Sequence, residues 1–242
     1  MDVPGSLKTD AIVLRSIRYG EADRVLHLYT PGHGRVPAIA KGSRRARSRF
    51  GGRLEPFFQL RTILHEGRSE LRTVTAAETL AGHRRLREHE ASLDAAARAC
   101  DAVSRLFETE QPHPGVYHLL ANELALLDAD PANATTANQL AFRLKLLLAA
   151  GLSPQLDGCA SCGERDHLAA FSPAAGGVVC GACEGAAFAF DEDAYTFMLR
   201  ALGAPLADAP AAPPRALRQV ERAIVELAEH HAHVHLRAAA AS

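Results

Sequence analysis

Several features that would place this protein in a membrane or outside the cell are missing from its 242 residues. No apolar run approaches the ~18 residues that a membrane-spanning helix needs. The first residues, Met1–Pro4, carry neither the basic nor the apolar region of a secretory signal. Cysteine is scarce: there are five, and four of them form one metal-binding pattern, which favours a reducing compartment. We therefore expect a cytoplasmic protein with no membrane partner.

Motifs of common enzyme sites are missing as well. Lys41-Gly42-Ser43 has the wrong order and the wrong upstream glycine spacing for a P-loop. Gly32-His33-Gly34 continues to Pro37, where a dinucleotide-binding fingerprint needs glycine. There is no G-x-S-x-G nucleophile elbow and no H-x-E that precedes a P-C-x-x-C. The sequence predicts a protein that is not an enzyme.

Among the features that are present, the four-cysteine pattern is the most specific. Two C-x-x-C pairs are separated by seventeen residues, with glycines close to each pair: Cys159, Cys162, Cys180 and Cys183. This spacing is typical of a zinc site. Four thiolates fill the tetrahedral coordination of one Zn²⁺ and leave no position for water or substrate, so we expect a structural ion within a module at 157–186. Two disulfides or unrelated thiols are the alternative. Cys100 lies on a helical apolar stripe and is interpreted as a core residue.

Charge and periodicity divide the chain into two parts. Residues 1–80 hold 14 basic and 8 acidic residues, a net charge of +6, whereas residues 81–242 carry a net charge of −7. The first part contains five short apolar segments rich in β-branched residues, which suit a small closed barrel such as an OB-fold. From about Ala81 the apolar residues follow a helical period. The prediction is an N-terminal OB-fold β-barrel at 1–80 and an all-α domain at 81–242 that carries the zinc module.

A basic segment within the barrel part is the candidate binding site. Seven cations fall within nineteen residues that contain no acidic residue: Arg35, Lys41, Arg44, Arg45, Arg47, Arg49 and Arg53. Neighbouring glycines and serines suggest a mobile loop whose N–H and hydroxyl groups also contact phosphates. A solvated charged surface is the alternative interpretation. Nearby aromatic residues either stack on bases or fill the barrel, and we expect Phe57 and Phe58 to point to opposite faces of a strand, one into the core and the other outward.

Two other clusters favour plain structural roles. The histidines at 230, 231, 233 and 235 lack an H-E-x-x-H arrangement and suit a partly solvated helix end. Arg215, Arg218 and Arg222 have acidic neighbours and indicate a salt-bridged helix face.

Particular stretches of the chain resemble the RecO family of bacterial recombination mediators. The N-terminal ones are Tyr19-Gly-Glu-Ala-Asp-Arg24, Leu28-Tyr-Thr30, Gly34-Arg35, Ala38-Ile-Ala-Lys-Gly42 and Ser48-Arg49. Further along, Ala150-Gly-Leu-Ser-Pro-Gln-Leu runs into Cys159-Ala-Ser-Cys162-Gly163, as in many members of that family.

The resemblance implies an OB-fold joined to a helical domain with a zinc module. It also implies binding of single- and double-stranded DNA and annealing of complementary strands, in a bacterial, nucleoid-associated setting. The implied partners are RecR and single-strand-binding protein, and through them RecA, which is loaded onto single-stranded DNA.

Other classes of function remain open from the residues alone. In a zinc-ribbon protein of transcription or translation, the cysteine module itself would contact nucleic acid or a polymerase. The module has one basic residue with a fixed charge, Arg165, and four acidic residues, Asp157, Glu164, Asp166 and Glu184. This charge balance argues against contact with phosphates. A zinc hydrolase would need an open metal position, and a pure adaptor would bind only proteins.

Overall fold

The computed structural model describes residues 5–67 and 71–239, which form two compact units. The first contains the described residues up to Ala96 together with Phe107–Ala129. The second contains Ala97–Leu106 together with the described residues from Asp130 onward. The domain boundary near residue 80 stays a prediction. In the described part of the chain, no helix combines the length and apolar character that crossing a bilayer requires.

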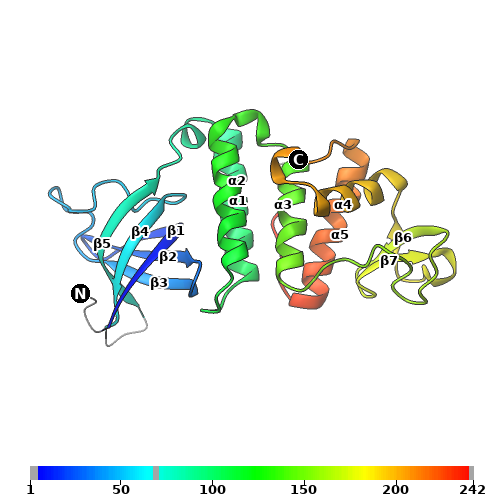
Figure 1. Ribbon diagram of the computed structural model, residues 1–242, viewed down its shortest axis with the longest axis horizontal. Coiled ribbons are helices and arrows are strands. Elements are labelled where there is room, and N and C mark those ends of the chain that lie inside the picture. The colour runs from blue at the N-terminus through cyan, green and yellow to red at the C-terminus, as the bar shows by residue number, and fades with distance from the viewer. Residues whose placement is uncertain (1–4, 68–70, 240–242) are drawn as a thin grey trace. The chain divides into compact units, whose positions relative to one another are not determined.

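The first unit contains a closed five-stranded barrel, as predicted (Figure 1). The strands pair in the order β1-β2-β3-β5-β4, and β3 and β5 are the one parallel pair in this order. Their bounds are β1 Ser6–Tyr19, β2 Asp23–Thr30, β3 Gly34–Ala40, β4 Gln59–His65 and β5 Arg72–Ala81. Alternate residues of β3 and β4 are buried, which is the pattern of a strand with one face on a core. The closed barrel confirms the OB-like fold.

Buried side chains fill the barrel from every strand and from the connection between β3 and β4. The core cluster contains Val13, Leu26, Leu28, Val36, Leu60, Leu64 and Val74, and the connection adds Phe50 and Leu54. Burying a phenylalanine side chain stabilises the fold by roughly 1.5–3 kcal/mol. The connection, although rich in glycine, is therefore tied to the barrel core through Phe50 and Leu54.

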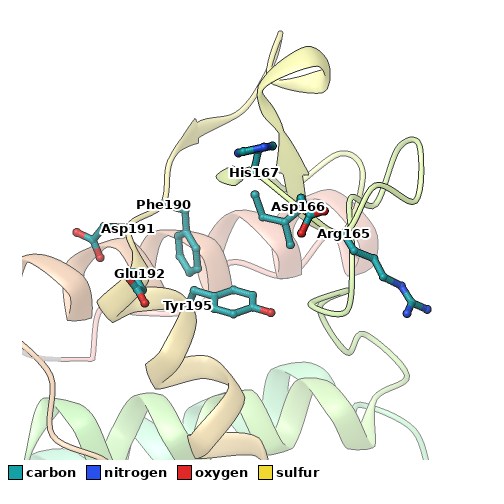
Figure 2. Close-up of a pocket in the computed structure, with 8 residues that line it drawn as sticks. Arg165, Asp166, His167, Phe190, Asp191, Glu192 and Tyr195 are labelled. Atoms are coloured by element: carbon teal, nitrogen blue, oxygen red, sulfur yellow. The ribbon is translucent and has the colours of Figure 1, made fainter.

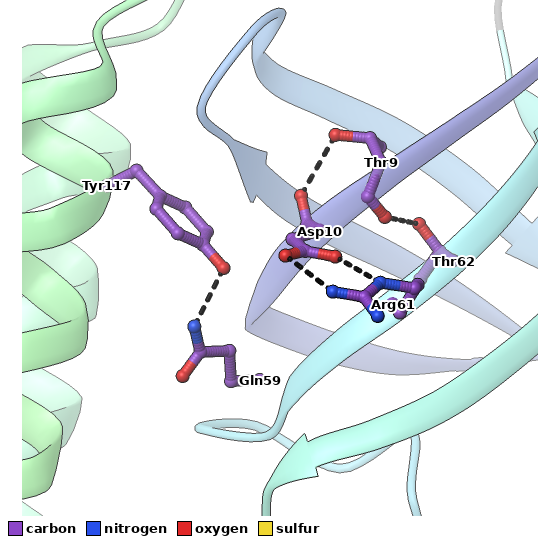
Figure 3. Close-up of polar contacts among 6 residues, drawn as sticks. All are labelled: Thr9, Asp10, Gln59, Arg61, Thr62 and Tyr117. Atoms are coloured by element: carbon purple, nitrogen blue, oxygen red, sulfur yellow. Dashed lines mark hydrogen bonds and ion pairs between the residues drawn. The ribbon is translucent and has the colours of Figure 1, made fainter.

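Helical elements follow the barrel within the first unit. They are η1 Arg85–Glu88, the start of α1 Glu90–Leu106, and α2 Pro114–Ala129. Gln59 donates a hydrogen bond of 2.9 Å to the Tyr117 hydroxyl of α2 (Figure 3). The ring of Phe107 packs edge-to-face on Tyr29, with 6.4 Å between the centroids. Residues 107–129 thus extend the hydrophobic packing of the barrel unit.

The second unit is helical with a small inserted sheet. Its remaining elements are η2 Pro131–Asn133, α3 Thr136–Ala149, β6 Leu168–Ser172, β7 Gly177–Cys180, η3 Gly181–Cys183, β8 Phe188–Ala189, α4 Glu192–Gly203, η4 Leu206–Asp208 and α5 Pro214–Ala232. Helices α3, α4 and α5 pack on one another. Thr135 and Asp191 cap α3 and α4 by accepting N–H bonds, which satisfies otherwise orphaned donors. The sheet, in the order β7-β6-β8, carries the cysteine module.

Candidate nucleic-acid interface and metal centre

The connection between β3 and β4 carries six of the seven predicted cations, and we call residues 41–53 the cationic loop. Two contacts attach its start to the β1–β2 turn. The Gly42 N–H donates to the Asp23 carboxylate at 2.7 Å, and the Arg44 N–H donates to the Ala22 carbonyl at 2.8 Å. Phe50 anchors the other end in the core, with 1% of its surface exposed. The loop is thus held at both ends, in contrast to the mobile segment that its composition suggests.

The cations of the loop point to solvent and are not neutralised. Lys41, Arg44, Arg45, Arg47 and Arg49 are exposed, and Arg53 is half-buried. Within the described residues, none of these six forms an ion pair with a carboxylate. Glu55, the first acidic residue after the loop in the sequence, pairs instead with Arg24 of β2 at 2.6 Å. The loop therefore offers a cluster of free positive charges, which is the electrostatic requirement for phosphate binding.

Arg35 does not join this cluster. It lies near the start of β3, whereas Lys41 directly follows the end of the strand, so about 20 Å of strand separates the two positions. Its backbone N–H donates to the Thr109 carbonyl at 3.2 Å. Arg35 instead lies near His27 of β2 and Arg15 of β1. Burial, followed by the charges of Arg35 and Arg15, lowers the pKa of His27. Arg15 and His27 were not predicted as site residues, although both fall on the outward-facing alternation of their strands.

The aromatic residues of the basic part differ sharply in accessibility. Tyr29 and Phe50 are buried, and burial raises the pKa of Tyr29 to about 12. Phe57 is also buried, and half-buried Phe58 packs against the barrel core and under the guanidinium of Arg87. The prediction that one of this pair points outward is wrong. Phe57 has a φ of +72° just before β4 begins, so strand alternation does not apply to the pair. Tyr19, by contrast, is 58% exposed.

The four predicted cysteines meet in the inserted sheet of the second unit. Their Sγ atoms all lie within 4.8 Å of one another, and the Sγ atoms of Cys162 and Cys180 are 3.7 Å apart. No disulfide joins them. A tetrahedron of thiolates about 2.3 Å from one metal ion has edges of about 3.8 Å, so the measured separation fits a shared ion. The cluster is positioned to hold one metal ion, which argues against the disulfide alternative.

Backbone hydrogen bonds shape each half of the cluster. The Gly163 N–H donates to the Cys159 carbonyl at 2.8 Å, and Gly163 has a φ of +80°, which favours glycine. Hydrogen bonds to the Cys159 thiol, first of all from the backbone of Cys180, lower its pKa to about 6. Contact with neighbouring thiols, first with Cys162, raises the pKa of Cys183 to about 12. A bound cation would favour the thiolate form at all four positions.

Cys100 stands apart from this cluster on α1. Its side chain is buried, and burial raises its pKa. This confirms its interpretation as a core residue rather than a reactive thiol.

The two C-terminal clusters have the structural roles that were predicted. The four histidines at 230, 231, 233 and 235 are exposed around the end of α5, where His231 contacts the Pro173 carbonyl at 2.8 Å. On the arginine face of α5, Arg222 pairs with Glu226 at 2.6 Å, and Arg215 pairs with Asp191 at 3.5 Å. Arg215 and Arg222, unlike the arginines of the cationic loop, have carboxylate partners.

A pocket of about 350 Å³ lies beside the cysteine module, between β6 and the start of α4 (Figure 2). Its lining consists of Arg165, Asp166, His167, Leu168, Phe190, Asp191, Glu192 and Tyr195. The most prominent polar groups serve the fold: Asp191 caps α4, and the Tyr195 hydroxyl donates to the Leu156 carbonyl at 2.9 Å. Charges of both signs border the pocket, so its electrostatics do not favour one ligand class.

Comparison with known proteins gives matches over almost the whole chain. Residues 1–83 match the family described as "Recombination protein O N terminal", and residues 92–239 match "Recombination protein O C terminal". The chain is 43% identical to the DNA repair protein RecO of Rubrobacter xylanophilus over 178 residues, which cover 73% of this chain and 71% of that protein. It is 36% identical to the DNA repair protein RecO of an Anaeromyxobacter species over 234 residues, which cover 93% and 91% of the two chains.

Proposed function

This chain belongs to the recombination protein O family of DNA repair proteins, and we propose that it binds single- and double-stranded DNA through the cationic loop and promotes annealing of complementary strands. The observation that carries the proposal is the group of six loop cations without a carboxylate partner among the described residues. Proteins that bind DNA without sequence preference depend on such cations, because each phosphate that is neutralised releases condensed counterions.

The proposed mechanism is charge neutralisation rather than covalent chemistry. Two DNA strands repel each other through their phosphates. Lys41, Arg44 and Arg45 cover phosphates close to the β1–β2 turn, and Arg47 and Arg49 extend the same positive surface. Because phosphate contacts leave the base edges free, strands held in this way still pair. Anchoring of the loop by Phe50 lowers the conformational entropy lost on binding.

The proposal extends to partners and to the metal. RecR and single-strand-binding protein are the proposed protein partners, and RecA loading onto single-stranded DNA is the proposed outcome. Support comes from family membership and from the acidic character of residues 81–242. The proposed cofactor is one structural Zn²⁺ held by Cys159, Cys162, Cys180 and Cys183, which braces the module and supplies no catalysis. We place the protein in the bacterial cytoplasm and do not assign it an enzymatic activity.

Annealing of two complementary oligonucleotides, followed by fluorescence quenching, tests this function with the full chain. The wild-type protein should accelerate annealing, and the K41E/R44E/R45E variant should lose most of that acceleration. A matched control, R215E/R218E/R222E, makes the same change in net charge on the salt-bridged face of α5 and should retain it. Equal activity of the loop variant and the wild type would remove the loop from the mechanism.

A further inference from the structure

The outer face of the barrel next to the cationic loop carries a row of aliphatic side chains. Ile17 of β1 pairs with Val25 of β2, and Val25 pairs with Ile39 of β3. Directly opposed residues project from the same face of a sheet, so the three form one row across three strands. Ile17 is 40% exposed, and Val25 and Ile39 are half-buried. The neighbouring positions Leu26 and Ala38 point into the core instead.

Tyr19 lies beside this row, on the side nearest the loop. Two residues along β1 from Ile17, it points to the same face and pairs in register with Asp23. Asp23 is the residue that accepts the Gly42 N–H, and Arg44 also donates from its side chain to the Gly20 carbonyl at 3.3 Å. The phenol ring is therefore adjacent to the first cations of the loop, and among the aromatic residues of the barrel strands and loop it is the exposed one.

On its other side, one step along each strand, the row is followed by Arg15 and His27, and beyond them the face is covered. Arg15 pairs with His27, and His27 pairs with Pro37, on the same face as Ile17. One further step along, Tyr29 is covered by Phe107, and Gly34 approaches the backbone of Thr109 and Gln111. The open part of the face thus runs from Tyr19 to Arg15 and His27, with the loop cations beyond Tyr19, the charge of Arg15 at the other end, and apolar surface between them.

We propose that this face is a platform for unpaired nucleobases, on which Tyr19 stacks a base and the row of Ile17, Val25 and Ile39 contacts the next ones, while the loop cations bind the phosphates. This inference rests on the proposed function, because the loop supplies the phosphate contacts. An apolar row with one exposed aromatic ring and the loop cations on one side and Arg15 on the other matches a single strand, since unpaired bases offer π-faces without regard to sequence. Paired bases in a duplex are already stacked, so double-stranded DNA uses the loop without the platform.

Equilibrium binding of a fluorescein-labelled 25-nucleotide dT strand, and of a duplex of the same length, to the full chain tests the platform. Tyr19→Ala should weaken binding of the single strand by about 5- to 150-fold, the factor expected for loss of one base–aromatic stack. Binding of the duplex should change by less than about twofold, and the salt dependence of single-strand binding should stay the same because no charge is removed. Tyr19→Phe keeps the ring and should bind the single strand like the wild type.

Two isoleucines form a matched control pair on the barrel surface. Ile17→Ala, within the row, should weaken single-strand binding, whereas Ile63→Ala on β4, with 37% of its surface exposed, should not. If Tyr19→Ala leaves single-strand affinity unchanged while K41E/R44E/R45E lowers it, the platform is refuted and the loop function stands. An equal loss for single strand and duplex in Tyr19→Ala also refutes the platform. If the wild-type protein binds no single strand, both the platform and the proposed function fail.

Discussion

Neutralising three loop cations should flatten the salt dependence of single-strand binding by a predictable amount. Five loop cations are exposed: Lys41, Arg44, Arg45, Arg47 and Arg49. Each phosphate contact on a single strand contributes a slope of about −0.7 to the plot of log K against log salt. Five contacts give about −3.5, and the K41Q/R44Q/R45Q variant, with two left, should give about −1.4. Between 50 and 200 mM salt, affinity should fall by about 130-fold for the wild type and about sevenfold for the variant.

Fluorescence anisotropy of a labelled oligonucleotide, titrated at four or five salt concentrations, measures both slopes. The R215Q/R218Q/R222Q variant is the matched control, because it removes the same charge from arginines of α5 of which two already pair with carboxylates. Its slope should equal that of the wild type. Identical slopes for the wild type and K41Q/R44Q/R45Q would refute the assignment of phosphate contacts to the loop. Equal flattening in both variants would mean that net charge, rather than the loop, controls binding.

Three further outcomes follow from the structure. Zinc analysis should give one ion per chain of the wild type and none in Cys180→Ser. In a thiol titration of the wild type, a chelator should release four reactive thiols, and Cys100 should react only on unfolding. Fast reaction of Cys100 in the folded protein would contradict its burial. Gly34→Ala should lower the free energy of unfolding, measured in urea, by about 2–5 kcal/mol. Gly34 has a φ of +56°, and a Cβ there would lie 2.3 Å from the Gln111 carbonyl oxygen. Gly32 has open space around it, so Gly32→Ala should lower the free energy of unfolding far less. Burial lowers the pKa of His83 below 6.5, so the unfolded chain takes up a proton before the folded chain as the pH falls. The free energy of unfolding should therefore decrease below pH 6.5. Between urea titrations at pH 7.5 and 5.5, this decrease should be smaller for His83→Asn, and an equal decrease would assign the effect to other groups.

Local patterns predicted the elements of the fold because each depends on nearby residues. Short apolar segments rich in β-branched residues predicted the five barrel strands, and the spacing of Cys159, Cys162, Cys180 and Cys183 predicted their convergence. The same patterns carried no information on packing between distant segments. Nothing in the sequence around Tyr29 indicates that Phe107 covers it, and the hydrogen bond between Gln59 and Tyr117 joins residues 58 positions apart.

The candidate interface shows the same limit. Composition identified the basic segment, but it did not separate Arg35 from the loop cluster or show that Glu55 pairs with Arg24 and leaves the loop cations free. Strand alternation failed for Phe57 because its left-handed backbone ends the regular period just before β4. Exposure of Tyr19 could not be predicted at all, since it depends on where the strand ends and on what packs over the neighbouring face.

Photo-crosslinking of the full chain to single-stranded DNA that contains 5-bromo-2′-deoxyuridine, followed by mass spectrometry, locates the strand on the protein surface. Crosslinks are expected on peptides that contain Tyr19 and residues 41–53, and they should disappear as salt is raised from 50 to 500 mM. Crosslinks confined to residues 130–239, with none on the barrel, would contradict this prediction.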